Sequence, residues 1–202
     1  MPTLLPVTFA LFTDPEQPVL DVPAAGARLR PWRPEDAPAV RAVYADEAIQ
    51  RWHVRVLESD DEAREVLGGW LAGWADGRES SWAVADAADD TVVLGRMAVK
   101  TFDPHGVGVV AYWTAPVARG RGVAPAALDV AANWAFAAGF HRLELVHSTD
   151  NASSCRVAEK AGFAAEGVLR ESVRHLDGWH DMHLHGRLAT REIGRPGRDR
   201  SA

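Results

Sequence analysis

One stretch near the middle of the chain constrains the fold most: an apolar segment, a glycine-bearing loop and a helix start, over residues 109–127. Val109–Trp113 is apolar, β-branched and aromatic, which predicts a strand that Pro116 ends. Pro125 opens a helical run, since proline is favoured in a helix's first turn. Glycines in the loop let the backbone approach a ligand beside the partial positive charge of the helix end. The stretch therefore predicts an anion site suited to a pyrophosphate.

The loop does not fit the best-known nucleotide motifs. It lacks the Gly-Lys-Ser/Thr of the P-loop and the third glycine of the dinucleotide-binding fingerprint. A purely structural connection between strand and helix would also explain its glycines. Two arginines favour the anion site, because each adds a full positive charge. The residues expected to bind a pyrophosphate are Arg119, Gly120, Arg121, Gly122, Val123 and Ala124.

Two motifs, in matching order and spacing, point to one family. Arg119, Gly122 and Ala124 match Arg/Gln-x-x-Gly-x-Gly/Ala, which resembles the coenzyme A pyrophosphate loop of the GNAT acyltransferases. The run from Asn151 to Phe163 resembles the N-x-x-S-x-R-V-A-E-K-x-G-F motif of the Rim-type subgroup, named for acetyltransferases of ribosomal-protein N-termini. The resemblance covers residues 27–190. It implies that an acetyl group moves from acetyl-CoA to a primary amine by direct attack.

Composition limits the remaining classes. The 202 residues suffice for one domain with a sizeable core, and the net charge of -6 argues against non-specific nucleic-acid binding. The single cysteine, Cys155, excludes an internal disulfide and suits a reducing compartment. No apolar run is long enough to span a membrane, and no basic residue precedes apolar Leu4–Phe12 as in a signal peptide. We expect a cytoplasmic protein without nucleic-acid or membrane partners; a homodimer stays open.

The order of elements predicts an α+β fold. We expect an extended N-terminal arm (1–26), a GNAT acetyltransferase domain (27–190) and a flexible basic tail (191–202). The resemblance implies that this domain holds a mixed, mostly antiparallel central sheet with a splayed parallel strand pair and flanking helices. The predicted strands are Arg28–Trp32, Ser81–Ala87, Thr91–Thr101, Val107–Trp113, Leu143–Val146, Phe163–Leu176 and Trp179–Leu188. The predicted helices begin at Pro34, Asp60, Pro125 and Asn151; Gln50–Glu58 is expected to be a loop, and Asp177-Gly178 a hairpin turn.

The resemblance also implies roles on the coenzyme side. The pantetheine arm would lie between the splayed strands, and a backbone N–H near Trp113 or Thr114 would hold the developing oxyanion. The tyrosine that many GNAT proteins use as acid falls at Ala158. The hydroxyl of Ser154, or a water it holds, would instead protonate or hydrogen-bond the leaving thiolate, while Asn151 binds the pantetheine amides. The alternative is local: Asn151 caps a helix and Ser154 bonds to its own backbone.

The acceptor side carries fewer signals. Trp52, His53, Trp82 and Trp179 are candidates to line an acceptor cleft. The amine must lose a proton, and the candidate bases are Glu171, His175, Glu58 and Glu166. We prefer Glu171, because the final hairpin commonly borders the acceptor cleft in this family.

Other readings remain beside this one. On a strand His183 and His185 share a face, and His180 is near, but no further ligand is evident, so no metal is expected. Cys155 is expected to be a small buried residue rather than an acyl carrier. The alternative functions are a non-catalytic acyl-CoA-binding sensor, an acyltransferase that uses a longer or charged acyl-CoA, and a structural domain that binds no nucleotide.

Overall fold

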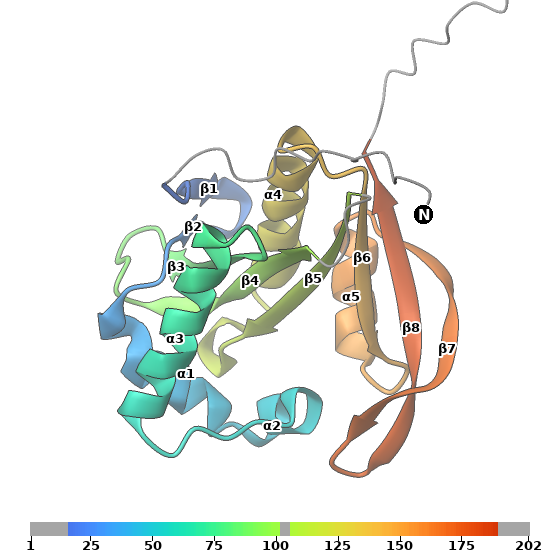
Figure 1. The fold of residues 1–202 in the computed structure, drawn as a ribbon, viewed down its shortest axis with the longest axis horizontal. Coiled ribbons are helices and arrows are strands. Elements are labelled where there is room, and N and C mark those ends of the chain that lie inside the picture. The colour runs from blue at the N-terminus through green and yellow to red at the C-terminus, as the bar shows by residue number, and fades with distance from the viewer. Residues whose placement is uncertain (1–15, 102–105, 190–202) are drawn as a thin grey trace, which may run out of the picture.

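The computed structural model describes residues 16–101 and 106–189. Its centre is an eight-stranded sheet flanked by helices (Figure 1). The strands are β1 (Leu20–Val22), β2 (Ala27–Arg30), β3 (Glu79–Asp86), β4 (Val93–Thr101), β5 (Val107–Thr114), β6 (Arg142–Ser148), β7 (Ala164–His175) and β8 (Gly178–Leu188). The helices are α1 (Ala37–Tyr44), α2 (Glu47–His53), α3 (Asp60–Ala75), α4 (Val123–Ala137) and α5 (Ala152–Lys160). Among these described residues, no helix is both long and apolar enough to cross a membrane.

The topology confirms the predicted α+β class. The strand order is β1-β2-β3-β4-β5-β6-β8-β7, and within the described part of the chain only β5 and β6 are parallel neighbours. Their pairing runs from Val107 and Arg142 to Val110 and Leu145. Beyond that point β5 stays paired with β4 up to Thr114, so β5 and β6 diverge. The sheet therefore opens at its middle, as the splayed pair predicts.

Helices cover both faces of the sheet. α1 and α3 pack on one face of the first strands, and α4 packs on the other, where its alanines allow close approach to the sheet. Trp70 and Trp74 are buried in the core, as their helical spacing predicts. Trp82 is fully buried too, and its indole N–H donates to the Pro18 carbonyl at 2.9 Å. Its assignment to an acceptor cleft is wrong, because β3 is a central strand with helices over both faces.

Several local expectations need correction. The segment through His53, expected to be a loop, is helix α2, whose N-cap Asp46 accepts the Ile49 N–H at 3.1 Å. Residues 20–22, assigned to an extended arm, form edge strand β1, and Val22 is buried in the core. The hairpin turn is Leu176-Asp177, one residue earlier than expected, because His175 pairs with Gly178. Helix α4 begins two residues before Pro125.

Some predictions fall outside the described residues. They are residues 1–15 of the expected N-terminal arm and the basic tail from 191 onward.

A buried ion pair ties β2 to the first helix. Arg30 donates two hydrogen bonds to the Asp36 carboxylate, at 2.8 and 2.7 Å, and their side chains are only 2% and 4% exposed. Asp36 also accepts the Arg33 N–H at 2.8 Å, while Arg30 reaches the Asp90 carbonyl. Both charges are thus fully paired, which is what makes their burial tolerable.

Candidate active site

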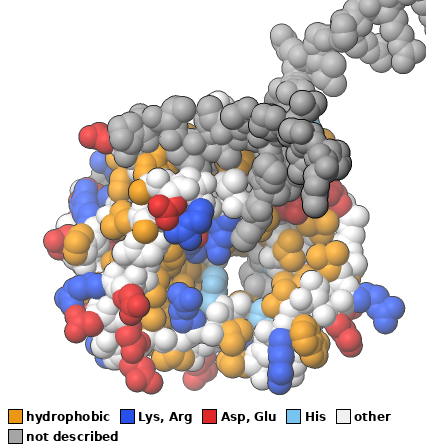
Figure 2. All heavy atoms as spheres, viewed as in Figure 1, with side chains coloured by type: hydrophobic (Ala, Val, Ile, Leu, Met, Phe, Trp, Pro, Cys, Tyr) orange, Lys and Arg blue, Asp and Glu red, His pale blue; other side chains and the backbone are white. Residues whose placement is uncertain are grey.

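A cleft of about 660 Å³ opens where β5 and β6 diverge. Its walls come from both strands, from α2, from the start of α4, from α5 and from the end of β7. Figure 2 shows the molecule hollowed near the centre of one face, with histidine side chains at the edge of the hollow. The volume is in the range of small-molecule and cofactor sites.

The predicted anion loop forms one end of this cleft. Gly120 and Gly122 have φ angles of 75° and 76°, which favour glycine, and Gly122 is the N-cap of α4. A Cβ at either glycine would meet nothing within 4 Å, so the space in front of the loop is open. The first N–H groups of a helix have no hydrogen-bond acceptor within the helix. In α4 the first residues line the cleft, so these N–H groups are available to a ligand there. The backbone is therefore arranged as an anion site requires.

The two loop arginines behave differently. Arg119 lines the cleft, but its guanidinium is 2.6 Å from the Asp46 carboxylate of the α2 N-cap. This contact holds the pKa of Asp46 below its ordinary value. Arg121 is exposed and does not line the cleft. Two cations that the sequence analysis did not single out, Arg156 and Lys160 of α5, do line it. Their spacing of four residues places both on one helix face, a pattern visible in the sequence.

The diverging strand presents backbone donors to the cleft. The Ala115 N–H donates to the Leu94 carbonyl of β4 at 2.9 Å. Alternate residues of a strand point their N–H groups to opposite sides, so the Trp113 N–H also faces β4. The N–H groups of Tyr112 and Thr114 face the other side, where β6 has departed. Of the two residues predicted to hold an oxyanion, Thr114 therefore has the suitable orientation.

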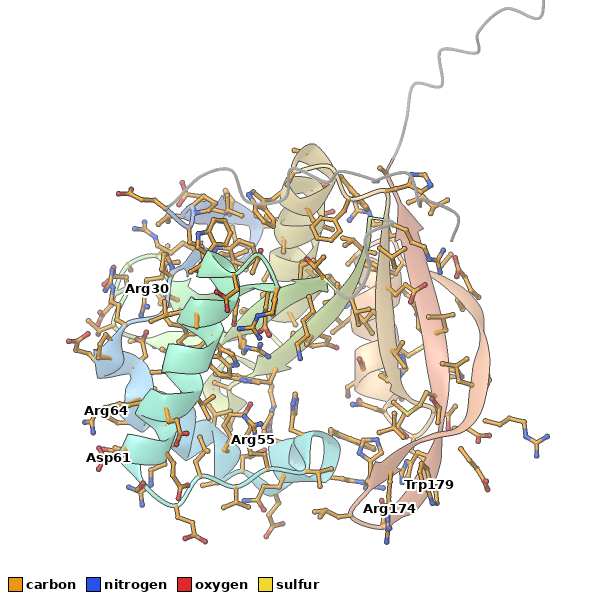
Figure 3. All side chains as sticks on the ribbon, viewed as in Figure 1. Arg30, Arg55, Asp61, Arg64, Arg174 and Trp179 are labelled. Atoms are coloured by element: carbon orange, nitrogen blue, oxygen red, sulfur yellow. The ribbon has the colours of Figure 1, made fainter. Side chains whose placement is uncertain are left out.

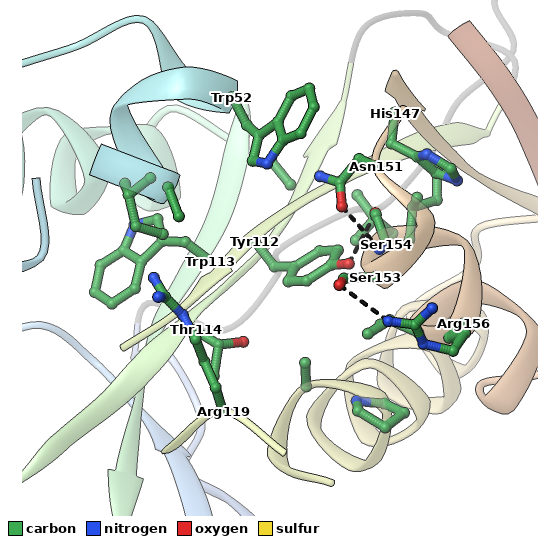
Figure 4. A pocket seen from close by; sticks show the side chains of 18 of the residues that line it. Trp52, Tyr112, Trp113, Thr114, Arg119, His147, Asn151, Ser153, Ser154 and Arg156 are labelled. Atoms are coloured by element: carbon green, nitrogen blue, oxygen red, sulfur yellow. Dashed lines mark hydrogen bonds between the residues drawn. The ribbon is translucent and has the colours of Figure 1, made fainter. Parts of the chain in front are cut away.

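A tyrosine and a serine meet in the middle of the cleft. The Tyr112 hydroxyl of β5 lies 2.8 Å from Oγ of Ser154, which is 6% exposed (Figure 4). Burial raises the pKa of Tyr112 to about 12, so the phenol stays protonated. Sequence reasoning looked for a tyrosine on the helix, at Ala158, and missed the one on the strand. Strand alternation was the available signal, because it sends Tyr112 to the opposite face from the core residue Trp113.

Asn151 serves the helix and the cleft together. Its Oδ1 accepts the Ser154 N–H at 3.1 Å, so it is the N-cap of α5, and it also lines the cleft. In Figure 4 its amide nitrogen points away from the cap, toward the cleft. The capping role and the predicted ligand role are thus compatible.

Helix α2 supplies two of the three predicted acceptor residues. Trp52 and His53 line the cleft, whereas Trp179 is 61% exposed and lies at the hairpin tip, outside it (Figure 3). Burial, with the charge of Arg96 as a smaller cause, lowers the pKa of His53 to about 4. His53 is therefore neutral at physiological pH.

A hydrogen-bonded chain reaches the cleft from the hairpin. Oγ of Ser148, at the end of β6, lines the cleft and lies 2.8 Å from Nδ1 of His180. Nε2 of His180 lies 2.7 Å from the Asp177 carboxylate, and this contact lowers the pKa of Asp177. An ionised carboxylate only accepts, so Nε2 carries the proton and Nδ1 can accept the Ser148 hydroxyl. No proton route through these three residues was predicted from the sequence, since Ser148 meets His180 only when the hairpin pairs with β6.

The four candidate bases lie in different places. Only His175 lines the cleft, and burial lowers its pKa. Glu171 is exposed at a bulge in β7 with a φ of 44°, and its N–H donates to Asp181. Glu166 is paired with Arg142, and Glu58 is exposed. No Asp or Glu is found among the described residues that line the cleft.

Comparisons with known proteins agree with this geometry. A family model described as an acetyltransferase (GNAT) domain matches residues 27–164. The chain is 25% identical over 167 residues to an uncharacterized N-acetyltransferase, YoaA, of Bacillus subtilis (strain 168), a match covering 81% of this chain and 94% of that protein.

Solved structures show the same fold. Mycobacterium smegmatis RimJ in complex with CoA-disulfide aligns with a TM-score of 0.74 and 25% identity, over 85% of this chain and 86% of that one. An acetyltransferase from Salmonella typhimurium, described as modifying the N-terminal serine of ribosomal protein L7/L12, aligns with a TM-score of 0.75. Its identity is 18%, over 86% of this chain and all of that one, so this second likeness speaks to the fold alone.

Proposed function

Because the chain belongs to the GNAT family of acetyltransferases, it transfers an acetyl group from acetyl-CoA to an amine, and we propose how its own residues carry out this reaction. The observation that carries the proposal is the Tyr112–Ser154 hydroxyl pair in the cleft, beside the α4 anion loop. The pair stands where a thioester would lie if its phosphates were bound at Gly120–Ala124. That arrangement favours an enzyme over a sensor that only binds acyl-CoA.

The coenzyme is held from two sides in this proposal. The N–H groups of the loop and of the first turn of α4 bind the pyrophosphate, and Arg119 adds charge by exchanging its contact with Asp46 for one with a phosphate. Arg156 and Lys160, on the facing helix, are further phosphate ligands. The Asn151 amide donates to the pantetheine arm between the diverging strands.

The reacting end is served by backbone and hydroxyl donors. The amine nitrogen attacks the thioester carbon, and the Thr114 N–H stabilises the charge that develops on the oxygen. The carbon–sulfur bond then breaks, and the Tyr112 and Ser154 hydroxyls stabilise the thiolate. A phenol with a pKa of about 12 is a weaker acid than a thiol with a pKa of about 8.5. Tyr112 therefore acts by hydrogen bonding rather than by complete proton transfer.

The proton of the amine leaves through the hairpin. The amine gives its proton to Oγ of Ser148 while Ser148 gives its own to Nδ1 of His180. Asp177 stabilises the imidazolium that results, as the carboxylate of a catalytic triad does. Glu171 remains the competing prediction for the base, and the two are separable by experiment.

The acceptor is a primary amine whose neighbouring groups contact Trp52 and His53. Peptide N-termini are the first class to test, since the structural relatives include proteins described as modifying ribosomal-protein N-termini. Cytoplasmic location and the absence of nucleic-acid and membrane partners remain predictions, and a homodimer stays open. The test is a screen of peptides and small amines with acetyl-CoA, succinyl-CoA and longer acyl-CoAs, followed by thiol release. CoA binding without turnover of any amine would favour the sensor.

The hydroxyl pair has its own test. Ser154→Ala should lower kcat by about 100-fold, and Tyr112→Phe by about 10-fold or more, with little change in KM for acetyl-CoA. Because the two hydroxyls act together, the double variant should be little worse than Ser154→Ala. Steady-state kinetics with one saturating amine measures all three. Unchanged kcat in both single variants would leave the pair a structural contact.

The route of the proton is tested by a matched pair of variants. His180→Gln should lower kcat by about 100-fold, because Ser148 loses the group that takes its proton. Glu171→Gln should leave kcat unchanged. The opposite result, a normal kcat in His180→Gln and a reduced rate at low pH in Glu171→Gln, would identify Glu171 as the base. CoA affinity should stay unchanged in both.

A further inference from the structure

Four nitrogen- and sulfur-bearing side chains converge between α5 and the sheet, at residues His147, Cys155, His183 and His185. Their ligand atoms, one from each residue, all lie within 4.8 Å of one another. The set is drawn from the consecutive elements β6 and α5 and from β8, which lies further along the chain. From the sequence alone His183 and His185 lacked further ligands, and the fold supplies His147 and Cys155. The Tyr112–Ser154 and Ser148–His180 contacts use none of these four side chains.

The register of the sheet explains the convergence. His147 pairs directly with His183, and Leu145 pairs with His185, so the three histidines project from one face. α5 covers this face and brings Sγ of Cys155 to 3.8 Å from Nε2 of His185. Nε2 of His147 lies 3.2 Å from the same His185 atom. Tetrahedral zinc with Zn–N near 2.0–2.1 Å and Zn–S near 2.3 Å implies ligand separations of about 3.3–3.6 Å. The two measured separations bracket that range.

The protonation of the cluster favours a cation. Nδ1 of His147 lies 2.8 Å from the Ser148 carbonyl, which can only accept, so this nitrogen carries the proton. Nε2 of His147 therefore directs a lone pair into the cluster, the arrangement that a backbone carbonyl imposes on metal-binding histidines. His185 is fully buried, and its Nε2 faces both Nε2 of His147 and Sγ of Cys155. One imidazole nitrogen carries either a single proton or a single lone pair, so hydrogen bonding can satisfy only one of these two contacts, whereas a cation between the three atoms satisfies all of them.

We propose that His147, Cys155, His183 and His185 bind one Zn²⁺ ion as a closed, four-coordinate structural site. Three imidazole nitrogens and one thiolate are a donor set that suits zinc, and four protein ligands leave no position for a reacting molecule. Glu159, whose carboxylate lies 3.6 Å from Sγ of Cys155, adds negative charge beside the ion. The site joins α5 to β6 and β8, and its ligand Cys155 directly follows Ser154 in α5.

The proposal does not depend on the proposed reaction. The family assignment carries no indication of a metal, and acetyl transfer as derived above needs none. Metal content and metal-dependent stability can therefore be measured without an amine substrate, and failure of either proposal leaves the other standing.

The first experiment measures metal in untagged protein. The protein is loaded with Zn²⁺, passed through a desalting column and measured by inductively coupled plasma mass spectrometry. We expect about one zinc per chain. Free Zn²⁺ at about 100 times its Kd should raise the folding equilibrium constant by about 100-fold, read as a higher thermal midpoint that EDTA reverses. Substoichiometric metal with an unchanged midpoint would overturn the proposal.

Variants and cobalt test the ligand set. His183→Gln should reduce retained zinc at least tenfold, whereas His141→Gln, which alters an exposed histidine outside the cluster, should retain it. In Co²⁺-loaded protein a thiolate-to-cobalt charge-transfer band should appear and be absent in Cys155→Ser. Normal zinc in His183→Gln, or an unchanged band in Cys155→Ser, would refute this set of ligands. A CoA-induced thermal shift in each variant verifies that it is folded.

Discussion

Gly122 holds the start of α4 in a backbone conformation that other residues adopt only with strain. A substitution there has two effects. A side chain at φ 76° strains the backbone and lowers stability, and the same side chain occupies space in front of the anion loop and so weakens anion binding. Gly26 separates them, because it has φ 57°, equally open surroundings and a position outside the cleft.

Gly122→Asp should therefore abolish most of the stabilisation by CoA, since its carboxylate occupies the anion site. In the parent, CoA at about 100 times its Kd should add about 2.7 kcal/mol to the free energy of unfolding. Gly26→Asp should lose a similar intrinsic stability but keep the whole CoA effect. Thermal unfolding with and without CoA measures this, and equal CoA shifts in the two variants would remove the loop from the binding site.

His53 makes the stability of the protein depend on pH. Its pKa is about 4 in the folded chain, against an ordinary value near 6.5 when unfolded. The folded state therefore binds fewer protons in this window, and stability that is fully present above pH 6.5 is lost as the pH falls toward 4. A difference of 2.5 units corresponds to about 3 kcal/mol.

His53→Gln should flatten this dependence, because glutamine does not titrate. Urea unfolding at pH 7, 5.5 and 4 should show a smaller loss of free energy in the variant than in the parent. His147 and His175, whose pKa values are also lowered, remain in both proteins and so cancel in the comparison. Parallel stability curves for parent and variant would contradict the assignment.

At the scale of elements, the Arg30–Asp36 pair connects β2 to the turn that starts α1. Asp36→Asn would leave the Arg30 guanidinium buried without its counter-charge, at a cost of about 3–5 kcal/mol. Asp90→Asn is the matched control, because the Arg33–Asp90 pair is 46% and 37% exposed and solvent screens its attraction. Urea midpoints compare the two. Equal destabilisation would mean that the buried pair contributes no more than the exposed one.

The elements themselves were largely predictable, and their differences have local causes. The meander, the parallel β5–β6 unit and the final hairpin follow from strand periodicity and turn residues. Helix α2 was missed because it is short, and Trp52 and His53 resemble a loop when considered without the Asp46 cap. β1 was missed because it is only three residues long and flanked by prolines.

At the scale of the whole molecule, the site divides into a predictable half and a half that depends on tertiary structure. The anion loop, Asn151 and Ser154 lie in contiguous motifs, so the sequence identifies them. Tyr112 and the Ser148–His180–Asp177 chain were not identified, because the Tyr112–Ser154 and Ser148–His180 contacts join elements far apart in the sequence. The preference for Glu171 rests on the expected place of the final hairpin beside the cleft, yet of the four candidate bases only His175 lines it.

Helix α2 contacts both the coenzyme loop and the hairpin that carries His180. Asp46 at its start holds Arg119 of the coenzyme loop, and Arg51 near its end lies 3.5 Å from Asp177, the partner of His180. If a coenzyme phosphate binds Arg119, the Arg119–Asp46 ion pair at the start of α2 is broken. The position of α2 then changes, and so does the position of Trp52, which lies in α2 at the acceptor end of the cleft. The two substrates should then bind with a shared coupling energy, equal in either order of addition. Exposed ion pairs are weak, so the coupling should be about fivefold, enough to favour one order of binding without enforcing it.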